Sequence, residues 1–344
     1  MTAAVTVLRP GLLASVQDLG RPGHRQLGIC PGGALGGVAL RLANRLAGNP
    51  DGAAGLELTL GGCELRFESP VRIALAGDDF GAELDGRPLA AWWSVPVVTG
   101  QVLRLHGANR GGGKPGVRSW LALSGGIAVP ELLGSRSTDL KARFGGFEGR
   151  ALRRGDRLPL GVSALDAAQL ARRPFGICAP DAGLAEDGAT VLRVMPGPEF
   201  EQFTVAAQKA LWSDDWRLTA RSDRMGSRLE GSELKRRRNV EMLSSAVIPG
   251  TIQVPPSGQP IILQGDAQTV GGYPRIGVVI GADLGRLALA PLNGRLRLQP
   301  VDPAAAWEAW LAQERYLAQV AQGLIAAGWP APAQNRGEGV FHAD

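Results

Sequence analysis

Three glycine-rich segments carry the polar side chains that are best suited to chemistry. An arginine fork can hold a carboxylate or a phosphate through two parallel hydrogen bonds, and the second segment offers such forks. Backbone N–H groups at the Gly271-Gly272 pair of the third segment can stabilise a developing oxyanion. The candidate residues are Gln17, Asp18 and Arg21 in SVQDLGRPGHRQLG, Arg224 and Arg228 in RSDRMGSRLEG, and Gln268, Thr269 and Tyr273 in LQGDAQTVGGYPRIG.

A structural interpretation of these segments stays open on composition alone. Aspartate and arginine also bridge tight β-turns, and glycine supplies the positive φ that such turns need. The sequence shows no nucleophile elbow, and its three histidines have no metal-ligand spacing. The sequence therefore predicts no metal site.

The segment ANRGGGKP at 108–115 resembles a phosphate-binding loop only superficially. That template needs glycine at position 108 and serine or threonine at position 115, where this chain has alanine and proline. Proline has no hydroxyl to ligate Mg²⁺. We therefore interpret the segment as a flexible glycine loop.

Composition and charge favour a globular protein of the cytoplasm. The 344 residues are 44% hydrophobic with a mean hydropathy near zero, and the net charge is +5. Basic residues are dispersed apart from KRRR at 235–238, which indicates a solvated strand or loop face or an acidic partner surface, and not nucleic-acid binding. No signal segment or long apolar run predicts secretion or a membrane span. Three widely spaced cysteines fit a reducing compartment, and we expect each to be buried and inert.

Short apolar strands separated by turns predict a mainly-β protein with a few helices. Apolar spacing predicts helices at 34–47 and 199–211, and a longer C-terminal helix after Pro303. The expected parts are an N-terminal β-barrel subdomain at 1–161, a linker at 162–189, a C-terminal β-barrel subdomain at 190–300, a C-terminal helix at 301–329 and a flexible tail at 330–344. The apolar stripe expected to dock the C-terminal helix consists of Trp307, Trp310, Leu311, Leu317, Ala321 and Leu324.

The three polar segments, in this order, resemble the carboxyltransferase subdomain A family. Stretches that carry the resemblance include PGLLASVQDLGRPG, LRLANRLAGN, LGSRSTDL, SDRMGSRLEG and AQTVGGYPRIG, and they extend over residues 5–300. The family includes the C subunit of 5-oxoprolinase, KipA-like proteins, the protein labelled allophanate hydrolase subunit 2, and a region of urea carboxylase. Because the matching segments are long and sequential, the chain is identified as a member.

The resemblance implies two cyclophilin-like β-barrel subdomains in a chain that works inside a complex. The implied partners are a KipI-like protein and a LamB/YcsF-like protein, and the implied reaction is the ATP-dependent conversion of 5-oxo-L-proline to L-glutamate. ATP is then used by the complex as a whole. Two alternatives stay open: a biotin-dependent carboxyltransferase component acting on a urea-like substrate, and a non-catalytic KipA-like antagonist of a histidine-kinase inhibitor.

Opening a lactam calls for an anion clamp and for donors to the carbonyl oxygen, and the resemblance leads us to assign these roles. The substrate-binding assignments are Arg224 and Arg228 as the clamp, with Arg21, Gln17 and Tyr273 around the pocket. The catalytic assignments are Gln268 and Thr269 as donors and Asp18 as an acid–base or arginine-orienting group.

The chain departs from the family pattern at four positions. Gly32 and Gly36 stand in place of serine and aspartate, Ser245 stands where the family often has glutamate, and Glu199 replaces a common histidine. All four changes alter polar groups. A third alternative therefore stays open: the chain is a divergent member of the family that acts on another amide or urea-like substrate.

Overall fold

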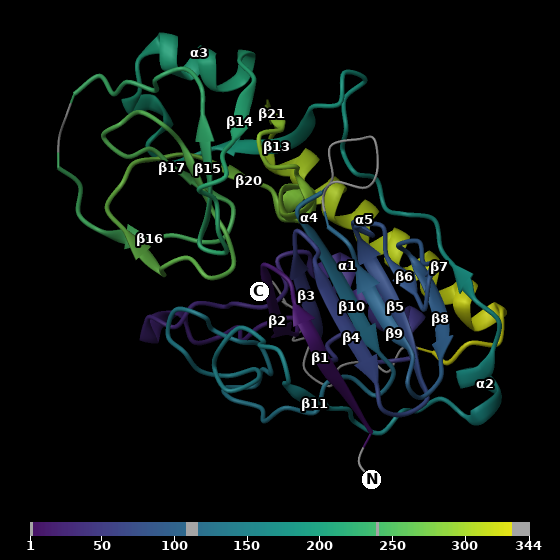
Figure 1. Ribbon diagram of the computed structural model, residues 1–344. Coiled ribbons are helices and arrows are strands. Elements are labelled where there is room, and N and C mark those ends of the chain that lie inside the picture. The colour runs from purple at the N-terminus through teal and green to yellow at the C-terminus, as the bar shows by residue number, and fades with distance from the viewer. Residues whose placement is uncertain (1–2, 108–115, 239–240, 332–344) are drawn as a thin grey trace, which may run out of the picture.

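The computed structural model describes residues 3–107, 116–238 and 241–331, and in it two strand-rich units lie side by side (Figure 1). The first unit consists of two six-stranded sheets, and all pairings within them are antiparallel. One sheet has the order β11 (Arg157–Pro159), β1 (Ala4–Pro10), β4 (Cys63–Phe67), β9 (Val102–Leu105), β6 (Glu83–Leu84) and β7 (Arg87–Pro88). The other has the order β12 (Phe175–Gly176), β8 (Trp93–Val97), β5 (Val71–Gly77), β10 (Arg118–Leu123), β3 (Gly55–Thr59) and β2 (Leu13–Gln17).

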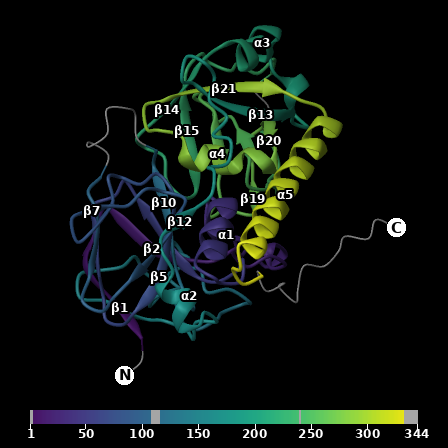
Figure 2. The ribbon, with the colours of Figure 1, turned by 90° about the vertical axis from the view of Figure 1, so that its right-hand side faces the viewer.

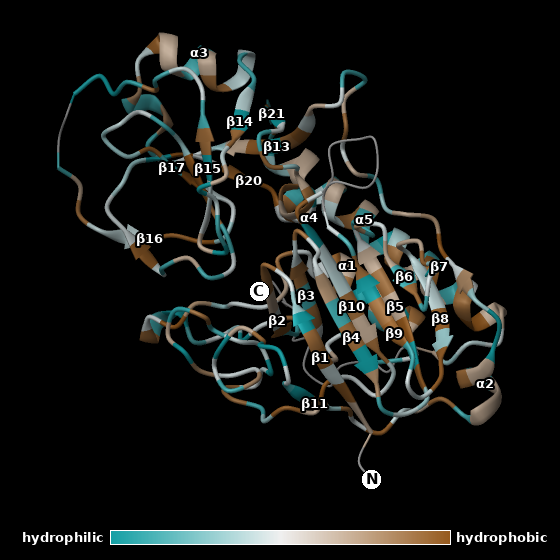
Figure 3. Cartoon of the chain, in the orientation of Figure 1, coloured by the Kyte–Doolittle hydropathy of each residue, from teal (hydrophilic) through white to brown (hydrophobic). Residues whose placement is uncertain are grey.

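The alternation of side chains along β5 and β10 explains how the first unit buries both faces of its second sheet. Ile73 and Leu121 point into the core shared by the two sheets. Their neighbours Ala74 and Trp120 point the other way and pack against α1 (Gly37–Leu46). In Figure 3 the strands of this unit show long brown stretches interrupted by teal ones. The helix predicted at 34–47 is confirmed as α1, which ends before Gly48 in the left-handed conformation.

The second unit is a closed barrel of seven strands around a single apolar core. Their order is β13 (Thr190–Pro196), β20 (Arg275–Val279), β17 (Thr251–Gln253), β18 (Ile261–Leu263), β15 (Gly226–Glu230), β14 (Trp216–Leu218) and β21 (Arg295–Pro300). A separate pair, β16 (Ser245–Ala246) and β19 (Val270–Gly271), projects from it. The mainly-β prediction is confirmed; among the described strands the ring closes in the second unit, and in the first they form two facing sheets.

The short helices of the second unit differ from the expectation. In place of one helix at 199–211 there is a 3₁₀ turn at Phe200–Gln202 followed by α3 (Val205–Ser213). The side chain of Thr204 caps α3 by accepting a hydrogen bond from the N–H of Ala207 at 3.2 Å, so the helix restarts at this point. The 3₁₀ turn Gly281–Asp283 and α4 (Leu284–Leu289) lie beside the first unit, where α4 contacts α1.

Residues 162–189 pack on the first unit. They contain α2 (Ala167–Ala171), and β12 pairs with β8. Arg72 of β5, fully buried, donates to the backbone carbonyls of Gln169, Arg172 and Arg173, so the end of α2 is tied to the sheet. The boundaries of the linker and of the other predicted parts stay predictions.

The C-terminal helix α5 (Pro303–Ala326) runs along both units (Figure 2). Its first half packs Ala309 against Ile280 and Ala282 of the barrel unit. Its second half buries Leu317 and Leu324, and beyond the helix the indole N–H of Trp329 donates to the carbonyl of Arg45 in α1 at 2.8 Å. No described helix is long and apolar enough to cross a membrane.

The predicted docking stripe of α5 is wrong at its two tryptophans. Trp307 and Trp310 are 58% and 42% exposed and stack on each other, with ring centroids 4.8 Å apart. Where the helix crosses the barrel unit, Ala309 and not a tryptophan packs against Ile280 and Ala282. Leu317 and Leu324 of the stripe are buried, as expected.

The glycine at position 36 accommodates the ring of Trp120. A Cβ atom at position 36 would lie 2.4 Å from Trp120 Cη2, inside the packed layer between α1 and β10. This contact explains why a residue with a side chain does not fit here.

We predict that Gly36→Ala lowers the free energy of unfolding by about 1–3 kcal/mol, because the extra methyl group overpacks this layer. In a Trp120→Phe background the same substitution should cost less, since the smaller ring leaves room. Urea unfolding of the four proteins measures this coupling. An equal cost of Gly36→Ala in both backgrounds would contradict the explanation.

Candidate functional site

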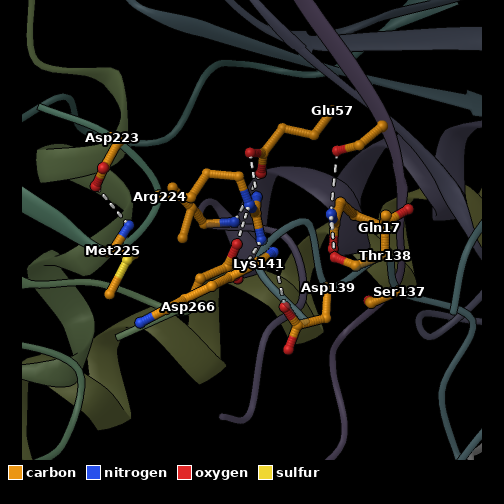
Figure 4. A network of polar contacts seen from close by, with 12 residues as sticks. Gln17, Glu57, Ser137, Thr138, Asp139, Lys141, Asp223, Arg224, Met225 and Asp266 are labelled. Atoms are coloured by element: carbon orange, nitrogen blue, oxygen red, sulfur yellow. Dashed lines mark hydrogen bonds and ion pairs between the residues drawn. The ribbon is translucent and has the colours of Figure 1, made fainter. Parts of the chain in front are cut away.

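The two units meet around the guanidinium of Arg224, which lies between β14 and β15 and is 4% exposed (Figure 4). Its Nε and Nη2 donate to the two oxygens of Asp266 at 2.8 and 2.9 Å. Its Nη1 donates to Glu57 of β3, and its Nη2 also donates to the carbonyl of Gly33 at 2.7 Å. Arg224 therefore binds acceptors from both units at once.

Glu57 connects this ion pair to the rest of the first unit. It accepts hydrogen bonds from the N–H of Leu35 at 2.8 Å and from the indole of Trp120 at 2.9 Å, and Arg118 Nε lies 3.7 Å away. Burial alone would raise the pKa of Glu57, but Arg224 and Arg118 outweigh it and hold that pKa below its ordinary value. At Asp266 burial prevails over Arg224, and the pKa is raised.

The two predicted clamp arginines do not converge. Nε, Nη1 and Nη2 of Arg224 each donate to a protein acceptor, so the geometry gives Arg224 a role in joining the units. Arg228 lies on β15, where it is exposed while Ser227 and Leu229 are buried, because neighbouring side chains of a strand point to opposite faces. The structure therefore gives the two arginines different surroundings, and a shared clamp stays a prediction.

Asp18 holds the loop at 135–137 and has little capacity left for a substrate. Its Oδ1 accepts from the N–H of Gly20 at 2.8 Å and from the hydroxyls of Ser135 and Ser137, and its Oδ2 accepts from the N–H of Arg136. None of these four contacts comes from an arginine side chain. The structure therefore favours the positioning of a loop over proton transfer at this carboxylate.

Arg21 and Gln17 lie against the same loop and keep polar atoms unpaired. Arg21 is 1% exposed, stacks on Phe144 with 4.6 Å to the ring centroid, and donates through Nη2 to the carbonyl of Ser137. Gln17 Nε2 donates to the carbonyl of Thr138 at 3.1 Å. Within the described part of the chain, Arg21 Nε and Nη1 and Gln17 Oε1 are buried without a hydrogen-bond partner.

The departure at position 32 lies beside these atoms. A Cβ at Gly32 would be 3.3 Å from Arg21 Nη1 and 3.9 Å from Asp266 Oδ1. Gly32 has a φ of +60°, a conformation that glycine adopts without strain, so a serine here would be strained as well as close to Arg21. Glu199, the departure from histidine, binds Arg275 through both carboxylate oxygens at 2.7–2.9 Å.

The remaining predicted residues lie around β19, outside the buried junction. Gln268 is exposed, and its Nε2 is 3.5 Å from Oε1 of Gln253. Thr269 is buried and accepts from the N–H of Val247 through its backbone carbonyl at 3.1 Å, while Tyr273 is 47% exposed. The structure thus brings Gln17, Asp18, Arg21 and Arg224 to one junction and leaves Gln268, Thr269 and Tyr273 on a neighbouring turn.

A cleft of about 410 Å³ lies between the two units and α5. Its floor includes Gly32 and Gly265, whose backbones are joined by a hydrogen bond of 3.0 Å. Its walls are mainly apolar, a composition typical of small-molecule sites. The polar side chains that line it are Arg41, Gln264, Gln313 and Glu314. None of these four was predicted, because Arg41 resembles the solvated face of a helix and the α5 residues meet the cleft only in the folded chain.

The cysteines and the basic run have structural surroundings. Burial raises the pKa of both Cys30 and Cys63 to about 12, and the thiol of Cys30 donates to Asp139. Cys178 is exposed, so the expectation that all three are buried is wrong for it.

In the basic run 235–238, Arg237 donates to the carbonyl of Phe203 at 2.9 Å. The segment 108–115 lies outside the described residues, and these residues contain no cluster of His, Cys, Asp and Glu that fits a metal ion.

Comparison with known proteins shows to which family this chain belongs. The model of the family described as the carboxyltransferase domain, subdomain A and B, matches residues 27–300. The chain therefore belongs to the carboxyltransferase domain family, as its motifs indicated.

Two curated relatives match over nearly their whole length. The C subunit of 5-oxoprolinase from Escherichia coli (strain K12) is 43% identical over 321 residues, which is 92% of this chain and 98% of that protein. The corresponding 5-oxoprolinase C subunit of Haemophilus influenzae is 38% identical over 307 residues, 89% of this chain and 94% of that protein. Among solved structures, the Kluyveromyces lactis urea carboxylase superimposes with a TM-score of 0.82 at 28% identity, covering 93% of this chain and 29% of that one.

We predict that Arg224→Ala lowers the free energy of unfolding by about 3–5 kcal/mol, because Asp266 loses its cation and Glu57 keeps only Arg118. Arg224→Lys should lose less, since it keeps the charge but not the planar fork. The matched control is Arg228→Ala on the exposed face of β15, expected to change stability by at most about 0.5 kcal/mol. Chemical denaturation compares them, and equal effects at the two arginines would contradict the buried ion pair.

The lowered pKa of Glu57 predicts a loss of stability in acid. A carboxyl whose folded pKa lies below its unfolded value of 4.5 stabilises the fold above that pH, and this contribution disappears as the pH falls through the folded value. The stability difference between the native chain and Glu57→Gln should therefore be largest near neutral pH and shrink below pH 4.5. Unfolding measured at a series of pH values tests this prediction. A stability difference between the two proteins that grows in acid would contradict it.

Proposed function

We propose that this chain is one component of an ATP-dependent 5-oxoprolinase complex that converts 5-oxo-L-proline to L-glutamate. The observation that carries the proposal is the end-to-end match to two proteins named as C subunits of 5-oxoprolinase. The cleft between the units supports it, because its volume of about 410 Å³ suits a small lactam acid. In this proposal the chain contributes binding and positioning groups to a site that its partners complete.

The chemistry explains why ATP and several chains are needed. A lactam is a stable amide, so its opening at neutral pH requires activation of the amide oxygen, and ATP supplies that activation through phosphorylation. The assembled complex uses ATP in this proposal. The described part of this chain contributes apolar walls and a few polar groups in the cleft, among them Gln264 and Gln313.

We further propose a KipI-like protein and a LamB/YcsF-like protein as the partners. The exposed apolar side chains around β19, such as Ile248, Val270 and Tyr273, offer a surface that another chain can cover. The catalytic roles of Gln268 and Thr269 belong to this proposal too, because both flank that surface. Asp18 enters it as a positioning residue, in line with its bonds to the loop at 135–137.

A second candidate function is a biotin-dependent carboxyltransferase step on a urea-like acceptor. The observation that favours it is the TM-score of 0.82 with the Kluyveromyces lactis urea carboxylase. The chain spans only 29% of that protein, so the rest of its machinery would have to come from other chains. A requirement for biotin would distinguish this function from the first.

Co-expression with the two proposed partners tests the main proposal. We expect release of glutamate from 5-oxoproline that requires ATP and all three chains, measured with glutamate dehydrogenase. Omission of each chain in turn is the control. An assembled complex that releases no glutamate but binds a histidine-kinase inhibitor would favour the KipA-like antagonist, and biotin-dependent carboxylation of urea would favour the second candidate.

A further inference from the structure

Arg41 of α1 is the cationic side chain among the described residues that line the cleft. Its Nε donates to Asp51 at 2.9 Å, which fixes one edge of the guanidinium. Its Nη1 donates to Glu314 of α5 at 2.9 Å. The Nε of Arg41, which we call its inner edge, is thus held by Asp51 of the same unit. Its Nη groups form the outer edge, and this edge faces α5, the helix that runs along both units.

The cluster formed by Arg41, Arg45 and Asp51 carries an excess positive charge. Arg45 binds the same carboxylate of Asp51 through its Nε and Nη2, both at 2.7 Å. Two guanidinium groups and one carboxylate leave one positive charge. Burial would raise the pKa of Asp51, but the hydrogen bonds from Arg45 and Arg41 hold it below its ordinary value, so the carboxylate stays ionised.

Glu314 balances that charge with a contact that is easily exchanged. Its side chain is 34% exposed, whereas that of Asp51 is 13% exposed. An ion pair so close to solvent contributes little to stability, because water and salt screen it. A second carboxylate that enters the cleft can therefore replace Glu314 on Arg41 without disturbing Asp51.

We propose that Arg41 is the carboxylate-binding residue of the cleft, and that Glu314 occupies it as a built-in competitor which a small carboxylate ligand displaces. The identification of that ligand as 5-oxoproline rests on the proposed function. Its carboxylate takes two parallel hydrogen bonds from the outer edge of Arg41, the geometry that a guanidinium fork favours.

Two other side chains that line the cleft suit the amide of such a ligand. Gln264 donates through Nε2 to Ser227 Oγ at 2.6 Å, and Gln313 donates through Nε2 to the carbonyl of Ala282 at 3.2 Å. Both side chains are thereby oriented, and both line the cleft. Their carboxamide oxygens are acceptors of the kind that an amide N–H needs. A ligand that carries both a carboxylate and an amide N–H matches these groups.

The proposal predicts shifts of opposite sign for two charge-neutralising variants. In the assembled complex without ATP, calorimetric binding of 5-oxoproline should tighten about 2- to 5-fold in Glu314→Gln, because the competitor is gone. It should weaken about 10- to 100-fold in Arg41→Gln, because charged hydrogen bonds are lost. The matched control is Glu308→Gln, the same charge change at an exposed position of the same helix outside the cleft, which should leave binding unchanged.

The lactam 2-pyrrolidinone, which lacks the carboxylate, separates this site from a general effect on α5. Its binding should not respond to Glu314→Gln. Weaker binding of 5-oxoproline in both variants would make Arg41–Glu314 a purely structural pair and overturn the proposal. If Arg41→Gln does not fold, Arg41→Lys keeps the charge, and the sign of the Glu314→Gln shift decides alone.

The two proposals fail in different ways. Glutamate release by the wild-type complex with a KM that neither variant changes would remove the Arg41 site and leave the proposed function intact. The complex could instead release no glutamate, while 5-oxoproline binds more tightly to Glu314→Gln and more weakly to Arg41→Gln. That result would keep the Arg41 site and remove the proposed reaction. The absence of both binding and turnover would remove both.

Discussion

A guanidinium that water cannot reach must keep its counter-charges, and this constraint organises the whole chain. Arg224 pairs with Asp266 of its own barrel unit and with Glu57 of the first unit, so separating the units would break the buried ion pair between Arg224 and Glu57. Such a penalty favours a single relative orientation. The neighbouring contacts follow from it, including the backbone bond between Gly32 and Gly265.

The cleft is a consequence of that orientation. Glu57 also holds the N–H of Leu35, and Arg224 holds the carbonyl of Gly33, so the segment that forms the cleft floor is fixed by the ion pair. α5 then closes the remaining side and brings Gln313 and Glu314 to the wall. The side chains that line the cleft therefore come from both units and from α5, which are far apart in the sequence.

Sequence reasoning located the junction better than it assigned the roles. Glycine, aspartate and arginine in tight turns indicated where Asp18, Arg21 and Arg224 lie, because turn chemistry is local. Glu57, which binds Arg224, is 167 residues away in the sequence. No sequence pattern reveals that the N–H donors of Arg224 are already bound to protein acceptors. Trp307 and Trp310 fitted an apolar stripe, but in the folded chain Ala309 packs against the barrel unit and both tryptophans are exposed. Arg41 became a candidate only when Glu314 lay beside it.

The distance between the two units measures the central constraint directly. Spin labels at Arg66→Cys on β4 and Lys209→Cys on α3, both exposed, report it by pulsed EPR once the exposed Cys178 is replaced by serine. A buried ion pair that fixes the orientation predicts one narrow distance distribution, and a broader one in Arg224→Lys. A distribution that is equally broad in both proteins would contradict the account.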